Sequence, residues 1–443
     1  MVATSQESII KAVRDNGVRF ISLQFTDIMG TVKTITVPVS QLENVMQNGI
    51  WFDGSSIQGF VRISESDMFL RPDLNTFAII PWLNSTHGTA RFVCDVFTPD
   101  GVPFVGAPRT ILASAMAEAA SMGYEYRVGP ELEFFLFETN DAGTPIPGAA
   151  HDDAGYFDLT ADRGSLVRDD MINALEPFGI DVEAGHHEVA NGQHEIDFRY
   201  GHALTTADAA VTFKYVLKAI AKQHGVYATF MPKPIRGING SGMHVHQSLA
   251  DTETGTNLFY DGDDKYGLSK LAKHFIAGQL AHARGMAAVL APLVNSYKRL
   301  VPGYEAPVYI SWARVNRSAL IRIPRAAAPA ATRLELRCPD PSCNPYLAFS
   351  VMLKCGLDGV KRELELCAAS EEDLFESVEA RSKLQTLPGT LKEAIDELDK
   401  DEVVRDALGP HIYQRFRDAK LREWDDYRLD VTPWELSRYL PTL

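Results

Sequence analysis

The sequence lacks a long apolar run and a surplus of basic residues. Its most apolar long stretch, residues 275–294, is interrupted by Gln279, His282 and Arg284, whereas a membrane span needs about 20 mostly apolar residues. The amino terminus has no apolar signal core. A formal net charge of −15 argues against a main role in binding nucleic acid or anionic membranes, because both require basic surface. We therefore expect the function to lie in a discrete site.

Cysteine pairs and common nucleotide-binding motifs are absent as well. The five cysteines are odd in number and include no C-x-x-C pair, which is typical of free thiols in a reducing compartment. We therefore expect a cytoplasmic protein. No G-x-x-x-x-G-K-[ST] phosphate loop occurs, and no G-x-G-x-x-G opens a helix after a strand. Any nucleotide must be bound differently; the G-I-N-G-S-G run at 237–242 could approach a ligand closely or be an ordinary turn.

Length and periodicity predict an α+β chain of two domains. At 443 residues the chain exceeds the roughly 250–300 residues at which one core stops growing. Prolines and glycines at 97–109 indicate a linker, so we expect a small β-rich domain over 1–103 and a large mixed domain over 104–443. The predicted elements are a hairpin at 18–37 turning at Met29-Gly30, strands at 77–82 and 90–96, helices at 108–122, 204–224 and 269–290 with Ser269 as N-cap, and an almost wholly helical chain after 345.

Polar side chains recur at alternate positions in four short stretches. They are Glu131 and Glu133 in ELEFF, His244, His246 and Ser248 in MHVHQS, Arg333, Glu335 and Arg337 in RLELR, and Glu195 in HEIDF. Alternate residues of a strand share a face, so each stretch presents a polar stripe. The residues between them are apolar and suit a packed core: Leu132, Phe134, Ile196, Phe198, Val245, Leu334 and Leu336. The pattern predicts a chemically active sheet face, with unrelated ion pairs on edge strands as the alternative.

Carboxylates on such a face require cations. Five of them would meet in one cavity: Glu131, Glu133, Glu188, Glu195 and Glu335. Each pair would repel by roughly 4 kcal/mol at ~4 Å and an effective dielectric of ~20, and the groups would protonate unless cations lay among them. Oxygen ligands favour Mg²⁺ or Mn²⁺, and an imidazole among them is compatible with Mn²⁺. The basic residues nearby imply an anionic substrate.

Six motifs, in order along the chain, resemble type I glutamine synthetase. They are DGSS at 53–56, GPELEFF at 129–135, HHEVANGQHEID at 186–197, NGSGMHVH at 239–246, NSYKRLVPGYEAP at 295–307 and LELRCPDPSCNPYLA at 334–348. The resemblance covers essentially the whole chain. It implies a small amino-terminal β-grasp-like domain and a large catalytic domain with a curved antiparallel sheet surrounded by helices. It also implies an ATP-dependent ligase that makes glutamine from glutamate and ammonium.

The resemblance implies roles for individual residues at the metal and nucleotide sites. One divalent ion is expected at Glu133, Glu188 and Glu195 and a second at Glu131, His244 and Glu335. Five carboxylates against two divalent ions leave a formal charge of −1, so the nucleotide phosphates need further positive groups. The implied ATP contacts are Glu183, Tyr200, His246, Ser248, Arg317, Arg322 and Arg333.

The resemblance also implies the amino-acid and ammonium sites. Glutamate is expected to contact Asn239, Gly240, Arg299, Glu305, Arg317 and Arg337. Its γ-carboxylate is a poor electrophile and must first accept the ATP γ-phosphate, with Arg317 stabilising the transferred group. Asp53 and Glu305 are expected to bind ammonium, and Asp53 to take its proton. Glu305 would lie on a flap that closes over the intermediate. Without the resemblance, Asp53 would be interpreted as a turn residue and Glu305 as a solvated charge.

Assembly and regulation follow from the same resemblance. The family forms a dodecamer of two stacked hexameric rings in which a neighbour's small domain supplies Asp53. Arg62, nine residues after Asp53, is a candidate for feedback inhibition by glutamine through Glu305, or else a surface or subunit contact. Ala330 stands where some relatives have a basic residue near the nucleotide, and the insertion used for adenylylation is missing. A nitrogen-regulatory protein is a candidate partner; nucleic acid and membrane are not expected.

Two other functions are compatible with parts of the pattern. A γ-glutamyl ligase acting on polyamines or other amines would share the metal and ATP residues, but would be expected to lose the ammonium-site acid and the flap glutamate. Both Asp53 and Glu305 are present. A glutamine-sensing relative acting mainly through a transcription regulator would tolerate losses among the six metal ligands, and none is lost.

Overall fold

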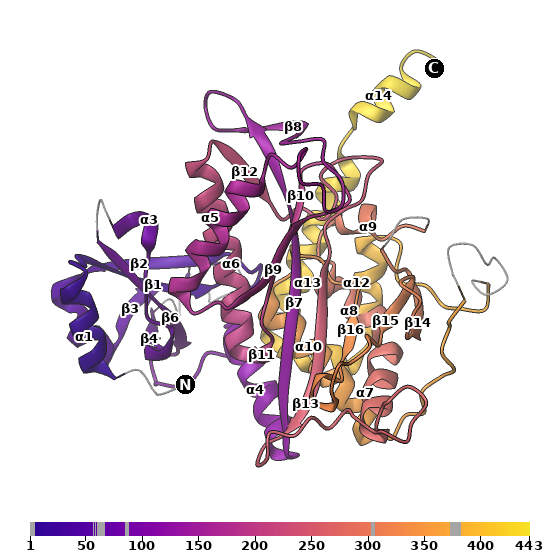
Figure 1. Ribbon diagram of the computed structural model, residues 1–443, viewed down its shortest axis with the longest axis horizontal. Helices are drawn as coiled ribbons and strands as arrows, with labels where there is room; N and C mark the ends of the chain where they lie inside the picture. Colours follow the sequence, from indigo (N-terminus) through magenta and orange to yellow (C-terminus); the bar gives the residue numbers. More distant parts are fainter. Residues whose placement is uncertain are drawn as a thin grey trace.

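The computed structural model describes residues 5–55, 57, 59, 67–84, 88–302, 306–372 and 382–443. A small amino-terminal domain lies beside a larger domain built around one long sheet (Figure 1). This is the predicted α+β architecture. The predicted boundary near residue 104 stays a prediction, and Arg62 and Glu305 lie outside the described residues.

The small domain is a mixed sheet covered by helices. Its elements are α1 (Gln6–Asp15), β1 (Phe20–Thr26), β2 (Val32–Pro38), α2 (Leu42–Asn48), β3 (Ile50–Asp53), β4 (Asp67–Pro72), β5 (Ala78–Ile79), α3 (Pro81–Asn84) and β6 (Thr89–Phe97). The strand order is β2-β1-β6-β4-β3, with β5 also paired to β6, and only β1 and β6 run parallel. Ser5 caps α1, whose Ile9 and Val13 enter the core because they lie on one helix face.

The predicted hairpin forms, and its turn joins the two domains. Gly30 has φ 82°, which favours glycine. The Asn344 side-chain amide donates to the carbonyls of Asp27 and Ile28 at 3.1 and 3.3 Å, so the turn is tied to the start of a catalytic-domain helix. The strand predicted at 77–82 was too long: it ends at Ile79, and α3 begins at Pro81, where a missing N–H is tolerated in the first helical turn.

The larger domain alternates strands and helices before becoming helical. Its elements are α4 (Pro108–Ser121), β7 (Tyr124–Thr139), β8 (Pro145–Ala150), α5 (Ser165–Leu175), β9 (Val182–His187), β10 (Gln193–Phe198), β11 (Gly201–His202), α6 (Ala203–Gln223), β12 (Val226–Thr229), β13 (Met243–Asp251), α7 (Lys270–Ala281), α8 (Ala283–Leu290), α9 (Ser296–Arg299), β14 (Tyr309–Ala313), β15 (Ala319–Arg322), β16 (Leu334–Leu336), α10 (Pro345–Lys361), α12 (Leu391–Lys400), α13 (Glu402–Leu429) and α14 (Pro433–Tyr439). Within the described ranges, none of these helices is both long and apolar enough to cross a bilayer.

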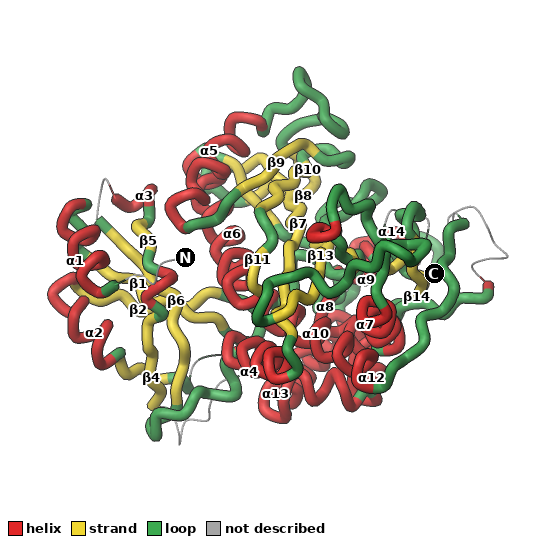
Figure 2. Tube along the Cα trace, turned by 60° about the horizontal axis from the view of Figure 1, so that its bottom comes forward, coloured by secondary structure: helices red, strands yellow, loops and turns green. Residues whose placement is uncertain are grey.

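The large sheet has a packed face and a polar face. Its order is β14-β15-β16-β13-β7-β10-β9, antiparallel except for the parallel pair β14 and β15. Helices α4, α7, α10, α12 and α13 gather on one side (Figure 2). The seven apolar residues predicted to pack behind the polar stripes are all buried, with Phe198 the most exposed at 5%. The predicted core face is therefore confirmed.

The helix predicted at 269–290 is two helices that meet at His282. Ser269 caps the first as predicted. The His282 ring lies 2.8 Å from Asp401 and 3.0 Å from Asp358, so it joins α12–α13 to α10. After α10, residues 364–371 are not helical, and α13 is interrupted at Gly409-Pro410, because that glycine has a positive φ.

A buried arginine joins the two domains. The Arg109 guanidinium donates to Asp95 at 2.5 Å and to Asp73 at 2.7 Å in the small domain. It also donates to both oxygens of Asp208 in α6, at 3.0 and 2.9 Å. Tyr346 donates to the same Asp208 at 2.7 Å. Arg109 is therefore surrounded by carboxylates from both domains, as a buried guanidinium requires.

The His282 contacts predict a pH-dependent stability. Burial alone would lower the pKa of His282, but its hydrogen bonds to Asp401 and Asp358 outweigh burial and raise it. A raised folded-state pKa gives stability that is complete below the unfolded pKa of about 6.5 and is lost as pH rises through the folded value. His282→Gln should lower the thermal midpoint more at about pH 6 than at about pH 9.

The matched control is His224→Gln, which removes a surface pair with Asp170 and should change the midpoint little at either pH. Equal destabilisation of the His282 variant at both pH values would contradict the charged pairing.

Candidate active site

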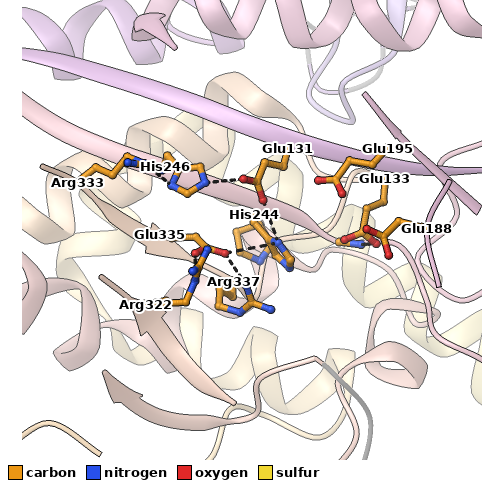
Figure 3. Close-up of polar contacts among 12 residues, drawn as sticks. Glu131, Glu133, Glu188, Glu195, His244, His246, Arg322, Arg333, Glu335 and Arg337 are labelled. Carbon is orange, nitrogen blue, oxygen red and sulfur yellow. Dashed lines mark hydrogen bonds and ion pairs between the residues drawn. The ribbon is translucent and has the colours of Figure 1, made fainter. Parts of the chain in front are cut away.

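Strand register brings the polar stripes together. Three rows of residues pair across neighbouring strands. The first joins Glu195 of β10 to Glu133 of β7, and the second joins Asp197 of β10 to Glu131 of β7 and His244 of β13. The third joins His246 of β13 to Glu335 of β16 and Arg322 of β15. Paired residues on adjacent strands point to the same face. The stripes predicted separately from sequence therefore form one continuous polar surface (Figure 3).

At one end of this surface, histidine and arginine side chains donate hydrogen bonds to the carboxylates. Glu131 lies 2.6 Å from His246 and 3.3 Å from His244. Burial alone would raise the pKa of Glu131, but the hydrogen bonds from both imidazoles hold it well below its usual value. Glu335 is fully buried and accepts from Arg322 and, at 2.5 Å, from Arg337. Both carboxylates are therefore kept ionised.

The other end has an excess of negative charge. Glu188 and Glu195 lie 3.2 and 3.3 Å from His186. Burial first, and the neighbouring Glu188 second, raise the pKa of Glu133 to about 8. Burial, followed by the charge of Glu133, also raises the pKa of Glu195. These shifts have the direction expected for carboxylates that need a cation.

Two compact groups of candidate metal ligands lie on this polar surface. One comprises Glu131, His246 and Glu335 and the other His186, Glu188 and Glu195, with the ligand atoms of each within 4.8 Å of one another. Each differs by one residue from the expected set, but His244 also lies 3.6 Å from Glu335. Burial and then the Arg337 charge lower the pKa of His244, which favours the neutral, metal-binding imidazole. Carboxylate and imidazole donors of this kind fit Mg²⁺ or Mn²⁺.

A cavity of about 360 Å³ adjoins Glu131 and contains most of the expected ATP contacts. Glu183, Tyr200, His246, Ser248 and Arg333 all line it, and so does Ala330. Arg333 donates to His246 at 3.1 Å, which orients that ring toward Glu131. Arg322 instead contacts Glu335.

A smaller cavity of about 40 Å³ adjoins Glu133 and Glu188. Of the six expected glutamate contacts, all except Glu305 and Arg317 line this cavity. They are Asn239, Gly240, Arg299 and Arg337. Arg299 is 4% exposed and donates to three backbone carbonyls, those of Arg337, Cys338 and Pro339. Its guanidinium is therefore fixed before any substrate arrives.

Two expected catalytic residues line neither cavity. Arg317 is exposed and lines neither cavity. Asp53 ends β3 in the small domain, is exposed, and accepts from the backbone N–H of Ser55 at 2.8 Å. The hydrogen bonds of Ser55 lower the pKa of Asp53. In a single chain, Asp53 and Arg317 therefore line neither of these two cavities.

Sequence reasoning missed four residues of the site. Asp197 and His186 lie two positions from Glu195 and Glu188, so the alternate-residue rule would have found them. Gln193 contacts Glu133, and Lys233 lines the glutamate cavity. Gln193 lies two positions before Glu195 in β10, so the same rule reaches it, whereas Lys233 lies outside the strands and carries no such signal.

Comparison with known families agrees with this geometry. The model described as "Glutamine synthetase, catalytic domain" matches residues 105–439, and "Glutamine synthetase, beta-Grasp domain" matches residues 17–99. The chain belongs to the glutamine synthetase family. Proteins named glutamine synthetase from Clostridium saccharobutylicum and Thermus thermophilus are each 54% identical, with 99% of both chains covered. One from Staphylococcus aureus is 48% identical, with 98% of both chains covered.

Solved structures give the same overall fold. Two structures described as a GmaS/ADP complex and as apo GmaS without ligand each have a TM-score of 0.86 and 34% identity. They cover 98% and 99% of this chain, and 99% of their own. The activity of this chain is that of the glutamine synthetase family, glutamate–ammonia ligation with ATP. The family uses divalent metals, and the two acidic and histidine groups are candidates to bind them.

The raised carboxyl pKa values predict proton release on metal binding. With a pKa of about 8, Glu133 carries a proton at neutral pH that a divalent ion must displace. Mn²⁺ titrated calorimetrically in buffers of different ionisation enthalpy should release more protons at about pH 6.5 than at about pH 9, and bind more tightly at the higher pH.

Glu133→Gln should remove the part of this proton release that depends on pH between those two values. Equal release by the wild type at both pH values would contradict a protonated Glu133.

Proposed function

We propose that the chain makes glutamine through a γ-glutamyl phosphate intermediate on the polar face of the large sheet. The observation that carries this is the position of the β7 stripe between two cavities. Glu131 lines the cavity with the expected ATP contacts, and Glu133, two residues away, lines the cavity with the expected glutamate contacts. A terminal phosphate and a γ-carboxylate entering from opposite sides would meet above the stripe.

We propose that one divalent ion binds Glu133, Glu188 and Glu195, and a second binds Glu131, His244 and Glu335. When bound, these ions neutralise carboxylate and phosphate charge. Arg333, fixed against His246, would contact a phosphate, and Arg322 would add positive charge beside Glu335. Arg337 and the preoriented Arg299 would bind glutamate, since a guanidinium suits a carboxylate.

We propose that Asp53 accepts the ammonium proton in a neighbouring subunit. Its exposure on the small domain, away from both cavities, supports action in trans. A dodecamer of two hexameric rings would provide the neighbour. The carboxyl terminus supports assembly: α14 extends away from the body (Figure 1) and leaves Trp434, Leu436, Tyr439 and Leu440 exposed, a patch typical of an interaction surface.

Product control is proposed on sequence grounds alone. Arg62 would pair with Glu305 when glutamine is bound, and Glu305 would otherwise belong to the ammonium site. Arg317, which is exposed, would stabilise the transferred phosphoryl group. A nitrogen-regulatory partner and a cytoplasmic location remain predictions. Relatives at 48–54% identity are named glutamine synthetase, so glutamine synthesis is favoured over ligation of other amines and over a purely sensing role.

The function is tested by phosphate release with glutamate, ATP and Mg²⁺, comparing ammonium with polyamines and methylamine. The wild type should respond to ammonium far more than to the other amines. Glu335→Gln keeps the side-chain shape but removes the charge that faces Arg322 and Arg337, and should lower the rate by roughly 100-fold or more.

Glu118→Gln, which disturbs only an ion-pair cluster with Lys354 and Lys361, serves as the control and should retain activity. Preference for another amine, or full activity of the Glu335 variant, would overturn the respective proposal.

Asp53 in trans predicts complementation. Asp53→Ala and Glu335→Gln should each be nearly inactive alone. After dissociation and reassembly of a one-to-one mixture, about a quarter of sites would combine an intact small domain with an intact catalytic domain, and activity should return in proportion. Action in cis would leave every mixed site defective, so an inactive mixture of confirmed hetero-oligomers would exclude this arrangement.

A further inference from the structure

Gln193, the first residue of β10, lines the glutamate cavity together with Glu133 and Gly240. Its side chain is 1% exposed and was assigned no role from sequence. The amide Nε2 donates to Glu133 Oε2 at 2.8 Å and to the carbonyl of Gly240 at 3.2 Å. One amide group therefore contacts both a candidate metal ligand and the backbone of the glutamate cavity.

These contacts fix the orientation of the Gln193 amide. The Gly240 carbonyl can only accept, and Glu133 Oε2 already accepts from the Gly242 N–H, so the amide nitrogen must face them; the reverse orientation would place three oxygens together. In this orientation Gln193 Oε1 is buried and has no hydrogen-bond partner among the described residues. An unsatisfied buried acceptor is destabilising, and such groups in native proteins call for a functional explanation.

The orientation determines which oxygen of Glu133 is free. Glu133 Oε2 accepts from Gln193 and also from the Gly242 N–H at 2.9 Å. Glu133 Oε1 lies on the side of Gly242, where an added methyl group would lie 2.6 Å from Arg299 Nη2, 3.1 Å from His244 Nε2 and 3.3 Å from Oε1. Gln193 therefore turns one oxygen of Glu133 toward the other candidate ligands.

The backbone of Gln193 contributes as well. Its carbonyl accepts from the Glu188 N–H at 2.8 Å, and its own N–H donates to the Ala190 carbonyl at 2.9 Å. These bonds hold the turn that carries Glu188. Two carboxylates expected at one ion are thus placed by a single residue, Glu133 through its side chain and Glu188 through its main chain.

We propose that Gln193 is a positioning residue that couples divalent-ion binding at Glu133 and Glu188 to glutamate binding at Gly240. This rests on the proposed function for the assignment of the ion and the substrate. An ion that fixes Glu133 also fixes the amide bonded to it, and the amide in turn restrains the Gly240 carbonyl. By linkage, the factor by which glutamate tightens ion binding should equal the factor by which the ion tightens glutamate binding.

The test uses Gln193→Met, which keeps the side-chain length but removes the donor, and Gln193→Asn, which keeps a shorter donor. The matched control is Gln279→Met. Gln279 is fully buried and also donates through Nε2 to two acceptors, Gln247 at 2.6 Å and the Met352 carbonyl at 3.0 Å, but in helix α7. Each assembled protein is titrated with Mn²⁺, with and without glutamate, by calorimetry, and its KM values and thermal midpoint are measured.

Gln193→Met should bind Mn²⁺ roughly 10- to 100-fold more weakly and raise the KM for glutamate about tenfold. The KM for ATP should stay within about twofold of the wild-type value. The factor by which glutamate tightens Mn²⁺ binding should fall. Gln193→Asn should lie between the wild type and Gln193→Met. Gln279→Met should change the thermal midpoint alone.

If either Gln193 variant that assembles matches Gln279→Met in Mn²⁺ affinity and in the glutamate effect, the positioning role is overturned. The two proposals fail separately. A wild type that makes no glutamine would overturn the function, whereas Mn²⁺ binding tests Gln193 without any turnover.

Discussion

Mutual repulsion among buried carboxylates is the constraint on which the site depends. At one end the repulsion is offset by hydrogen-bond donors of the protein: Arg322 and Arg337 bracket Glu335, and two imidazoles face Glu131. At the other end it is not, and the pKa values of Glu133 and Glu195 are raised. The uncompensated end is where a divalent ion gains most, because there it replaces protons on closely spaced carboxylates.

Holding such groups together requires a rigid scaffold, which the long central strand β7 provides. It contacts strands on both sides, so its stripe lies in the middle of the polar face. Its opposite face is packed on buried helices, and the interdomain contacts of Arg109 and Asn344 fix the small domain beside it. Packing on one face allows charge to be concentrated on the other, since side chains that are locked in place cannot move apart to relieve repulsion.

Much of this could be predicted from the sequence. The alternation in ELEFF and MHVHQS indicated both the polar stripe and the apolar residues behind it, and caps such as Ser269 were visible locally. Prediction failed where a long-range contact overrode a local pattern. The helix expected at 269–290 breaks at His282, where the ring meets Asp358 and Asp401 from two later segments.

The sequence by itself determined the residue types of the site, their face of each strand and, through its motifs, the family. These depend on spacing within a single segment, which the strand period sets. Only the tertiary structure decided that Arg299 is held by three carbonyls, that Gln193 connects Glu133 to Gly240, and that Asp53 lies apart from both cavities. Such contacts join positions distant in sequence, and register and loop packing, which no local pattern encodes, bring them together.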